Sequence, residues 1–271
     1  MKFKNLEDKC LYYRGLTDYK LLPNSNVIVM LDGKNFSKMI KNKFEKPFDD
    51  DFIEMMNDTA KFLCNNVQGV KFAFVQSDEI SLLLTDYDTP DTDIAFGGRL
   101  CKIQSILASL ATSEFNREFL KHAIKDVHGE GPIMEKICEM KFCQFDCKAW
   151  TVPSQNDAYA WFLYRQLDCI RNSKQQFAQT YLPHKDLMGK TTDDQIRLVA
   201  ERYDMYWDLL MPKYKFGRFI YKEAESATAV TPKGDTVNYV RDKFRVFPAF
   251  ELKEDSGKEK FYDKAFPRNE A

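Results

Sequence analysis

The order of apolar and polar residues along the first half of the chain predicts six helices and strands. An unbroken apolar run that ends at Asp32 is typical of a buried strand, and apolar residues three or four apart indicate two amphipathic helices. Two further apolar runs enclose four polar residues, Gln76 to Glu79, which predicts a hairpin with acids at its tip. The predicted order is strand, helix, strand, strand, helix and strand, at about residues 27–31, 50–67, 70–75, 80–84, 95–115 and 140–152.

This order of elements is that of the split βαβ unit of ferredoxin-like domains. In that topology the first strand lies beside the hairpin. The chain is therefore expected to form an α+β fold of the kind found in polymerase palms, with an antiparallel sheet, packed helices and a helical carboxyl-terminal extension. The same fold also serves simple binding modules, so the fold alone leaves the function open.

The second half of the chain is expected to be helical at first and to pack on the palm. Apolar residues recur at helical spacing in two stripes, Ala160, Leu163, Leu167 and Ile170 in the first and Ile196, Val199, Tyr203, Trp207 and Leu210 in the second. Short strand-like stretches follow residue 216, and the charged segment from residue 253 has little to bury, so we expect loose order there. The expected organisation is a palm-like core, residues 1–152, and a helical and short-strand part, residues 153–271, in one continuous domain.

Composition is that of a globular protein with a sizeable core, because 44% of the residues are hydrophobic and 30% are charged. The seven cysteines are an odd number without a CxxC pair, which favours buried thiols over disulfides or zinc and suits the reducing cytoplasm. The amino-terminal residues lack the apolar segment of a signal peptide, and no apolar run reaches the length of about 20 residues that crosses a bilayer. A cytoplasmic protein without a membrane span is expected.

The overall charge shows no basic excess of the kind common in proteins that coat nucleic acid, because the net charge is −1 and the pI is about 6.4. Contact with RNA phosphates would depend on local groups of basic residues, although each group by itself is more often solvated surface. The groups are Lys41, Lys43 and Lys46; Lys213, Lys215, Arg218 and Lys222; and Arg241, Lys243 and Arg245.

Two acids stand where a magnesium site could form. Asp32 ends the first predicted strand and Asp78 lies at the tip of the hairpin, so in a split βαβ sheet both would face one crevice. Mg²⁺ takes one or two carboxylates, while its other positions hold water and substrate phosphates. Two ions about 3.5–4 Å apart would hold the attacking and leaving oxygens of a phosphoryl displacement, with Glu79 completing or orienting the site. The alternative is that residues 77–79 form a plain polar turn.

Residues suited to binding a triphosphate accompany these acids. Gly33 allows the backbone to bend closely around a ligand, and the N–H groups of the residues after it can bind phosphate oxygens. Lys46, Arg99 and Lys102 would neutralise the charge that two Mg²⁺ ions leave on a nucleoside triphosphate.

Five short segments together resemble the tRNA-His guanylyltransferase family in their order and approximate spacing. They are Asp32-Gly33-Lys34-Asn35-Phe36, Phe44-Glu45-Lys46-Pro47, Gln76-Ser77-Asp78-Glu79, Phe145-Asp146-Cys147-Lys148, and Arg165-Gln166-Leu167-Asp168 with Asn172. The similarity covers residues 27–222. It implies a polymerase-like palm, tRNA as the partner and a homo-oligomer, typically a tetramer.

The resemblance also implies an unusual direction of synthesis at the 5′ end of tRNA. ATP first activates the 5′-monophosphate as an adenylylated end, and the 3′-hydroxyl of an incoming nucleotide, GTP or another NTP, then attacks it. By this resemblance Asp32, Asp78 and the Gly33 carbonyl would bind two Mg²⁺ ions, and Glu79 would support them. The triphosphate would lie along Lys34, Asn35 and Phe36, by side chain or backbone, with Lys46, Ser77 and Lys102 nearby.

A polar face is expected on the predicted helix around residue 165. Arg165, Asp168 and Asn172 are three and four residues apart, so they share one face, opposite the apolar stripe of the same helix. They form either a structural ion-pair cluster or a polar wall beside the activated 5′ end of the tRNA. Further along the chain, the candidates for contacts with the tRNA backbone are Arg218, Lys222 and Arg241.

The chain departs at three positions from the eukaryotic guanylyltransferases of this family. Ser37 and Ile170 stand where those enzymes have histidines, and Phe48 replaces the asparagine of their KPND motif. These departures favour the guanylyltransferase-like members, which resemble templated 3′-to-5′ polymerases that repair 5′-truncated tRNAs. Untemplated addition of guanylate to histidine tRNA is the alternative function, and a nonenzymatic RNA-binding module is an alternative of a different class.

Overall fold

A six-stranded antiparallel sheet forms the centre of the computed structural model, which describes residues 2–34, 36, 43–89, 91–230 and 235–267. The strands are β1 Asn26–Lys34, β2 Val70–Gln76, β3 Glu79–Leu84, β4 Gln144–Val152, β5 Arg218–Val230 and β6 Thr236–Pro248. They lie in the order β4-β1-β3-β2-β5-β6, and each neighbouring pair is antiparallel. The first four positions are those of the split βαβ unit, so the predicted α+β, palm-like fold is confirmed.

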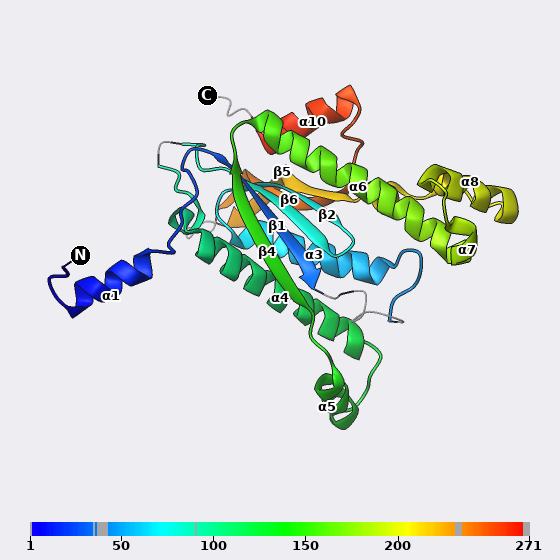
Figure 1. Cartoon of the computed structure of the whole chain (residues 1–271), viewed down its shortest axis with the longest axis horizontal. Coiled ribbons are helices and arrows are strands. Elements are labelled where there is room, and N and C mark those ends of the chain that lie inside the picture. Colours follow the sequence, from blue (N-terminus) through cyan, green and yellow to red (C-terminus); the bar gives the residue numbers. More distant parts are fainter. Residues whose placement is uncertain (1, 35, 37–42, 90, 231–234, 268–271) are drawn as a thin grey trace.

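Helices cover both faces of the sheet (Figure 1). They are α1 Leu6–Gly15, α3 Asp50–Asn66, η1 Ala95–Gly98, α4 Leu100–Ile124, α5 Glu130–Glu139, α6 Gln155–Tyr181, α7 His184–Leu187, α8 Thr192–Tyr203, η2 Trp207–Leu209, α9 Pro212–Lys215 and α10 Asp255–Ala265. α3 and α4 pack on one face, and α6 and α10 pack on the other. α7, α8 and η2 form a smaller core with the carboxyl-terminal half of α6, whereas α1 and α5 bury no side chain and project from the body.

Among these helices, none in the described parts of the chain combines the length and the apolar composition that crossing a membrane requires.

The sequence supplies the caps and turns that position the hairpin. Asp49 caps α3, because its side chain accepts a hydrogen bond from the Phe52 N–H at 2.8 Å. Between α3 and β2 the chain turns at Gly69, which has a φ of +81° and lies so close to the Thr85 carbonyl that a Cβ would be 2.6 Å from its oxygen. This turn sets the start of β2, which then runs to the polar tip of the hairpin.

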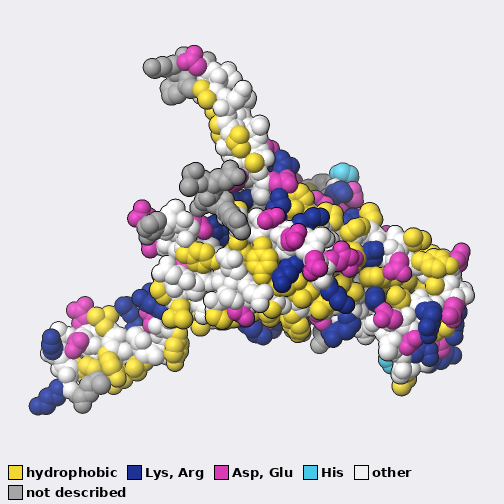
Figure 2. Space-filling view, turned by 90° about the horizontal axis from the view of Figure 1, so that it is seen from above, with side chains coloured by type: hydrophobic (Ala, Val, Ile, Leu, Met, Phe, Trp, Pro, Cys, Tyr) yellow, Lys and Arg dark blue, Asp and Glu magenta, His cyan; other side chains and the backbone are white. Residues whose placement is uncertain are grey.

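β5 and β6 form a long hairpin, where the sequence predicted only short strands. Each strand has 13 residues, but only residues 218–221 of β5 pair with β2. Most of the hairpin therefore pairs with itself and projects from the body as an arm (Figure 2). Because few side chains of this arm are buried, it lacks the apolar alternation from which strand length is predicted.

Two further expectations for the second half are wrong. Residues from 253 onward were expected to bury little, but α10 buries Phe261 and Ala265 in the core beneath α6. The stripe from Ala160 to Ile170 was expected to pack on the palm, but Leu167 is 46% exposed, whereas Arg165 is buried. α6 therefore turns a different face to the sheet, and that face carries polar residues.

Candidate active site

Asp32 and Asp78 meet at one end of the sheet. Asp32 lies near the end of β1, where it pairs with Glu79 of β3 on one side and with Asp146 of β4 on the other. Asp78 lies in the turn between β2 and β3, and its carbonyl oxygen accepts a hydrogen bond from the Gly33 N–H at 3.0 Å. The sheet register therefore gathers four carboxylates, because residues paired across antiparallel strands lie about 5 Å apart.

Asp32 faces the side of the sheet that α6 partly covers. Side chains alternate along a strand, and Ile28 of β1 and Trp150 of β4 pack into the core beneath α6. Asp32, Asp146 and Lys148 follow the same alternation and so lie on that face. Asp146 and Lys148 are exposed and Asp32 is partly buried, so the site is open to a substrate.

The electrostatic environment of these acids favours a bound cation. Burial raises the pKa of Asp32 to about 6, and the charges of the three neighbouring carboxylates add to the effect of burial, while Lys148 opposes it. Burial also raises the pKa of Asp78. A divalent cation would remove the repulsion between these carboxylates and stabilise their ionised forms.

The residues present fit Mg²⁺, which keeps several water or substrate ligands. Within the described ranges, no group of three or more histidine, cysteine, aspartate or glutamate side chains is arranged to hold a metal ion. Asp32 and Asp78 would supply two carboxylates and Gly33 a carbonyl oxygen, which leaves positions for water and phosphate. Cys143 and Cys147 are not turned toward these acids, because both side chains belong to the apolar core on the opposite face of the sheet, where burial raises the pKa of each thiol.

Glu79 is bound by two partners on the α6 side. It forms an ion pair with Arg165, and its Oε2 accepts a hydrogen bond from the Gln76 Nε2 at 2.6 Å. Arg165 also donates to Asp168 at 3.1 Å, and Asn172 donates to the same carboxylate at 3.2 Å. Only 6% of Arg165 is exposed, so the predicted polar cluster exists but is turned toward the sheet. These contacts favour an orienting role for Glu79.

The segment after Asp32 offers its backbone, and not the Phe36 ring, to a ligand. A Cβ at Gly33 would lie 2.5 Å from that ring, so only glycine fits there. Phe36 is buried, and its ring packs against those of Phe115 and Phe145 with centroids 4.9 and 5.1 Å apart. A role for Phe36 in lining the triphosphate is therefore limited to its backbone.

Three predicted phosphate contacts are exposed on the described surface. Lys34 ends β1 beyond Asp32, Ser77 precedes Asp78 in the hairpin turn, and Lys46 precedes α3. Asn35 lies outside the described residues, as do Lys41 and Ser37.

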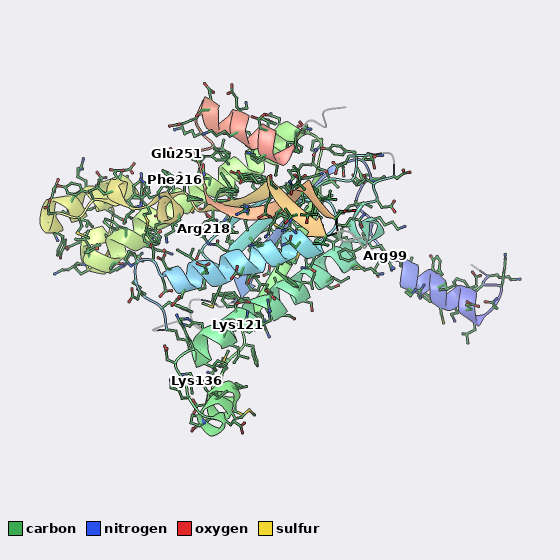
Figure 3. The ribbon with its side chains drawn as sticks, turned by 180° about the vertical axis from the view of Figure 1, so that it is seen from behind. Arg99, Lys121, Lys136, Phe216, Arg218 and Glu251 are labelled. Atoms are coloured by element: carbon green, nitrogen blue, oxygen red, sulfur yellow. The ribbon has the colours of Figure 1, made fainter. Side chains whose placement is uncertain are left out.

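The structure does not bring Lys102 to the acids of the same chain. Thr112 of α4 lies level with the active-site end of β4, because its Oγ1 accepts a hydrogen bond from the Phe145 N–H at 3.1 Å. Lys102 precedes Thr112 by ten residues, which is about 15 Å of helix, and α4 covers the opposite face of the sheet. Figure 3 shows Arg99 at the α1 end of the molecule, away from Lys121 near the other end of α4. The prediction that Lys102 and Arg99 flank the acids is therefore wrong.

The predicted tRNA contacts occupy different environments. Arg218 is only 5% exposed, its Nε donates to the Asn57 Oδ1 at 3.0 Å, and burial lowers its pKa to about 10. This burial corrects the prediction that Arg218 contacts the tRNA backbone from the surface. Lys222 and Arg241 are exposed on the projecting hairpin, where Arg241 pairs with Glu225 at 3.3 Å.

Three residues at the site had no predicted role. Asp146 is the partner of Asp32 in the β1–β4 pairing, Lys148 pairs with Met30 two residues before Asp32, and Gln76 binds Glu79. The Oε1 of Gln76 and the Nε of Arg165 are buried without a hydrogen-bond partner in the described structure. The available signal was the strand alternation around the Phe145-Asp146-Cys147-Lys148 segment, which places Asp146 and Lys148 on one face once the register is known.

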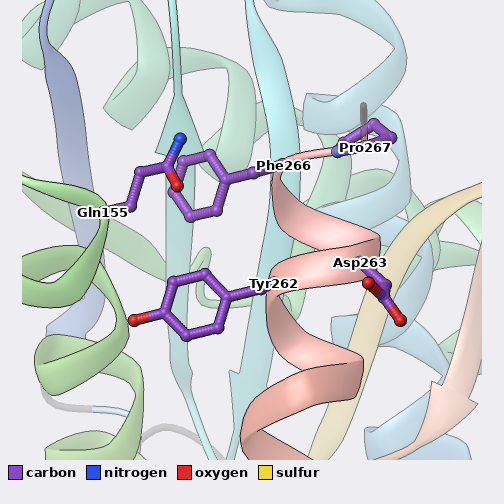
Figure 4. Close-up of a pocket in the computed structure, with 5 residues that line it drawn as sticks. All are labelled: Gln155, Tyr262, Asp263, Phe266 and Pro267. Carbon is purple, nitrogen blue, oxygen red and sulfur yellow. The ribbon is translucent and has the colours of Figure 1, made fainter. Parts of the chain in front are cut away.

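A separate cavity of about 690 Å³ lies at the other end of the sheet (Figure 4). It is lined by Gln155, Tyr262, Asp263, Phe266 and Pro267. Gln155 begins α6 just after Val152, and Val152 pairs with Asn26 at the start of β1. The length of β1 therefore separates this cavity from Asp32, and the cavity is not part of the acidic site.

Comparisons with known proteins agree in one family. The family model described as tRNAHis guanylyltransferase matches residues 9–153, more than half of the chain. The tRNA(His) guanylyltransferase of Debaryomyces hansenii is 30% identical over 233 residues, which cover 80% of this chain and 80% of that protein. A bacterial tRNA(His) guanylyltransferase-like protein in complex with ATP superposes with a TM-score of 0.78 and 28% identity, covering 97% of this chain and 100% of that one. A bacterial structure in complex with GTP gives a TM-score of 0.74 and 27% identity, with 96% and 99% covered.

Proposed function

Because the chain belongs to the tRNA(His) guanylyltransferase family of nucleotidyltransferases, we propose that it extends the 5′ end of tRNA in the 3′-to-5′ direction. The single observation that carries this proposal is the pair of acids, Asp32 and Asp78, which the sheet register holds together at its open end. Similarity to structures in complex with ATP and with GTP supports nucleoside triphosphates as substrates.

Two phosphoryl displacements make up the proposed reaction. In the first, an oxygen of the tRNA 5′-monophosphate attacks the α-phosphorus of ATP, pyrophosphate leaves, and the 5′ end becomes adenylylated. In the second, the 3′-hydroxyl of the incoming nucleoside triphosphate attacks the 5′-phosphorus, and AMP leaves. Each step replaces one P–O bond by another, so a single metal site can serve both.

The residues of this chain would bind and orient the reactants. Two Mg²⁺ ions held by Asp32, Asp78 and the Gly33 carbonyl would supply positive charge where negative charge develops on the reacting oxygens. The N–H groups after Gly33 and the exposed lysines near the acids would hold the triphosphate. Glu79, fixed by Arg165, would keep the adjacent Asp78 in position.

Templated repair of 5′-truncated tRNA is the proposed use of this chemistry. At two of the three positions where this chain differs from the eukaryotic enzymes, the side chain packs against aromatic or apolar residues. Phe48 stacks on Tyr214 with centroids 5.0 Å apart, and Ile170 packs against the smaller core around α6. Neither side chain can form the hydrogen bonds of the asparagine and the histidine that the eukaryotic enzymes have at these positions, which favours selection of the nucleotide by the opposing base.

Single-nucleotide incorporation tests this proposal. The protein is incubated with Mg²⁺, ATP and a 5′-monophosphorylated tRNA that lacks its first nucleotide, and the 5′ end is examined for the adenylyl group. Each NTP is then supplied singly to substrates that differ only in the opposing base. Incorporation that follows the opposing base supports repair, guanylate added whatever that base is supports the alternative, and absence of an adenylylated end contradicts the proposal.

We further propose that the protein is located in the cytoplasm and forms a homotetramer. The cytoplasm rests on the reducing environment that the free cysteines suit, and the tetramer rests on the family resemblance. A chain of net charge −1 would also gain from neighbouring subunits that contribute basic residues to one tRNA path.

A further inference from the structure

The amino-terminal helix α1 projects from the body although it has too few residues to be stable by itself. It has 10 residues and buries none of them, and an isolated helix shorter than about 12–15 residues is marginal in water. The segment after it is fixed, because the Arg99 Nε donates to the Asp18 Oδ1 at 2.8 Å and the Leu100 N–H donates to the Tyr19 carbonyl at 2.9 Å. α1 is therefore held away from the sheet and needs a partner that covers it (Figure 1).

The surface of α1 is apolar and carries a net positive charge. Leu6 is 76% exposed, Tyr13 is 56% exposed and Leu16 is 54% exposed. Leu6 and Tyr13 are seven residues apart, so they lie on the same side of the helix. Residues 2–15 contain two acidic side chains, Glu7 and Asp8, and four basic ones, Lys2, Lys4, Lys9 and Arg14. Large apolar side chains exposed together in this way mark a site of protein contact.

A second apolar surface follows α8, which lies at the end of the molecule opposite α1 (Figure 1). Leu209 is 82% exposed at its centre. Trp207 anchors the segment, because this ring is buried and its Nε1 donates to the Ser173 Oγ at 2.9 Å. The apolar side chains therefore stand on a fixed support. This Leu209 surface consists of Tyr203, Met205, Tyr206, Leu209 and Met211.

The two surfaces are complementary in charge. Residues 201–211 contain one basic side chain, Arg202, and three acidic ones, Glu201, Asp204 and Asp208. The net negative charge of this segment matches the net positive charge of α1, and both surrounding surfaces are apolar. Because the two surfaces lie at opposite ends of one chain, they can meet only between two copies.

We propose that α1 of one copy packs on the Leu209 surface of a second copy, and that the second copy returns its own α1 to the first. A two-fold axis relates the two copies, so both surfaces are covered on each of them. A one-way contact would instead leave a free α1 and a free Leu209 surface at the ends and would grow into filaments. The inference rests on the homotetramer of the proposed function and names one of its interfaces.

A carboxylate placed in either surface tests the exchange. Leu6→Glu and Leu209→Glu should each raise the dissociation constant of the paired subunits by about 10- to 150-fold, the effect of losing one buried large apolar side chain. At a concentration where the unmodified protein is a tetramer, light scattering should then give half its mass or less. Met134→Glu is the matched control, because Met134 is 57% exposed on α5, and it should leave the mass unchanged. All three side chains are exposed in the single chain, so each variant should fold.

Cross-linking identifies which surfaces meet. Cys10 of α1 lies four residues after Leu6 and three before Tyr13, and its thiol is free and exposed. In the variant Leu209→Cys, a short bismaleimide should join two chains, and mass spectrometry should find the peptide with Cys10 linked to the peptide with residue 209. Adding Cys10→Ser should abolish this link, and Met134→Cys should not form one with Cys10.

Three outcomes would overturn the inference. They are an unchanged mass for both Leu6→Glu and Leu209→Glu, absence of the link between Cys10 and residue 209, and weaker tRNA binding by Leu6→Glu with an unchanged mass. The last would assign α1 to the RNA. Adenylylation of the 5′ end separates this inference from the proposed function. A protein that exchanges α1 but never adenylylates tRNA would refute only the function, whereas an active protein whose mass ignores both substitutions would refute only the exchange.

Discussion

Replacing Asp32 with asparagine should make the metal-free protein more stable while it abolishes activity. Partial burial and repulsion from the neighbouring carboxylates raise the pKa of Asp32 to about 6. Because this folded value lies above the unfolded one, the folded state binds the proton more tightly, and stability is lost as the pH rises from about 4 to about 6. Asparagine keeps the shape of the side chain and removes the charge.

The structure sets the size of the effect. A pKa raised from 3.8 to about 6 corresponds to about 3 kcal/mol, at about 1.36 kcal/mol per pKa unit. Asp32 is partly exposed, so solvent screens the repulsion, and we expect the free energy of unfolding to rise by about 1–2 kcal/mol above pH 7. Below about pH 4 the gain should vanish, because Asp32 is then protonated in both states.

Urea denaturation in the presence of EDTA measures this gain, at about pH 4 and about pH 7.5. Asp126→Asn removes the same charge from an exposed position and should change the free energy of unfolding by less than about 0.5 kcal/mol. Mg²⁺ should stabilise the unmodified protein at the higher pH but not Asp32→Asn. A variant less stable than the unmodified protein at about pH 7.5, or a gain that is equal at both pH values, would refute the reasoning.

Other measurements separate the roles of individual residues. Asp78→Ala should abolish both adenylylation and nucleotide addition, because both displacements use the same carboxylates, and near-normal turnover by the folded variant would contradict this. Lys46→Ala should raise the KM for ATP by about 10- to 150-fold through loss of one charged hydrogen bond, whereas Lys102→Ala should leave it unchanged; equal effects would show that one of the two is misplaced. Arg241→Ala should weaken tRNA binding and lower its log–log salt slope by about 0.7–0.9 without changing the KM for ATP, as titrations over a salt series would measure. Light scattering should give the mass of a tetramer, and a monomeric mass with full activity would exclude a functional need for assembly.

The centre of the fold could be predicted because its strands are buried on both faces. β1, β2 and β3 therefore consist largely of unbroken apolar residues, and the polar turn between β2 and β3 interrupts them at one place. The β5–β6 arm could not be predicted in the same way. Beyond residue 221 its strands pair with each other and bury few side chains, so their pairing leaves little trace in the pattern of hydrophobicity.

The orientation of α6 could not be predicted, because the polar residues of its buried face have partners far along the chain. The Gln166 Nε2 donates to the Phe250 carbonyl at 2.8 Å, and its Oε1 accepts from the Leu252 N–H at 2.7 Å. A prediction of the buried face from hydrophobic periodicity considers the polarity of each residue by itself, without its hydrogen-bond partners. It therefore assigned Leu167 to the packed face, although a satisfied amide is as easily buried as a leucine.

The two acids proposed to bind metal could be predicted because each lies at the end of a recognisable strand or turn. Asp146 and Lys148 were missed because their proximity to Asp32 depends on the pairing of β1 with β4, which no local pattern records. Lys102 was misplaced for a related reason. Nearness in the sequence to the acidic hairpin suggested nearness in space. However, β3 runs from Glu79, the partner of Asp32, to Leu84, the partner of Val27, so it carries the chain to the other end of the sheet before α4 begins.

The buried ion pair between Arg165 and Glu79 is better explained by positioning than by stability. Removing two charges from water costs about as much as their attraction returns, so apolar residues of similar size would hold α6 to the sheet as well. Apolar residues would not fix the direction of the Glu79 carboxylate. Glu79 follows Asp78 in the chain and pairs with Asp32, so fixing Glu79 restrains the backbone that carries both acids. Arg165 also donates to Asp168, so one buried guanidinium joins Glu79 to α6 and holds that helix in place over the acids.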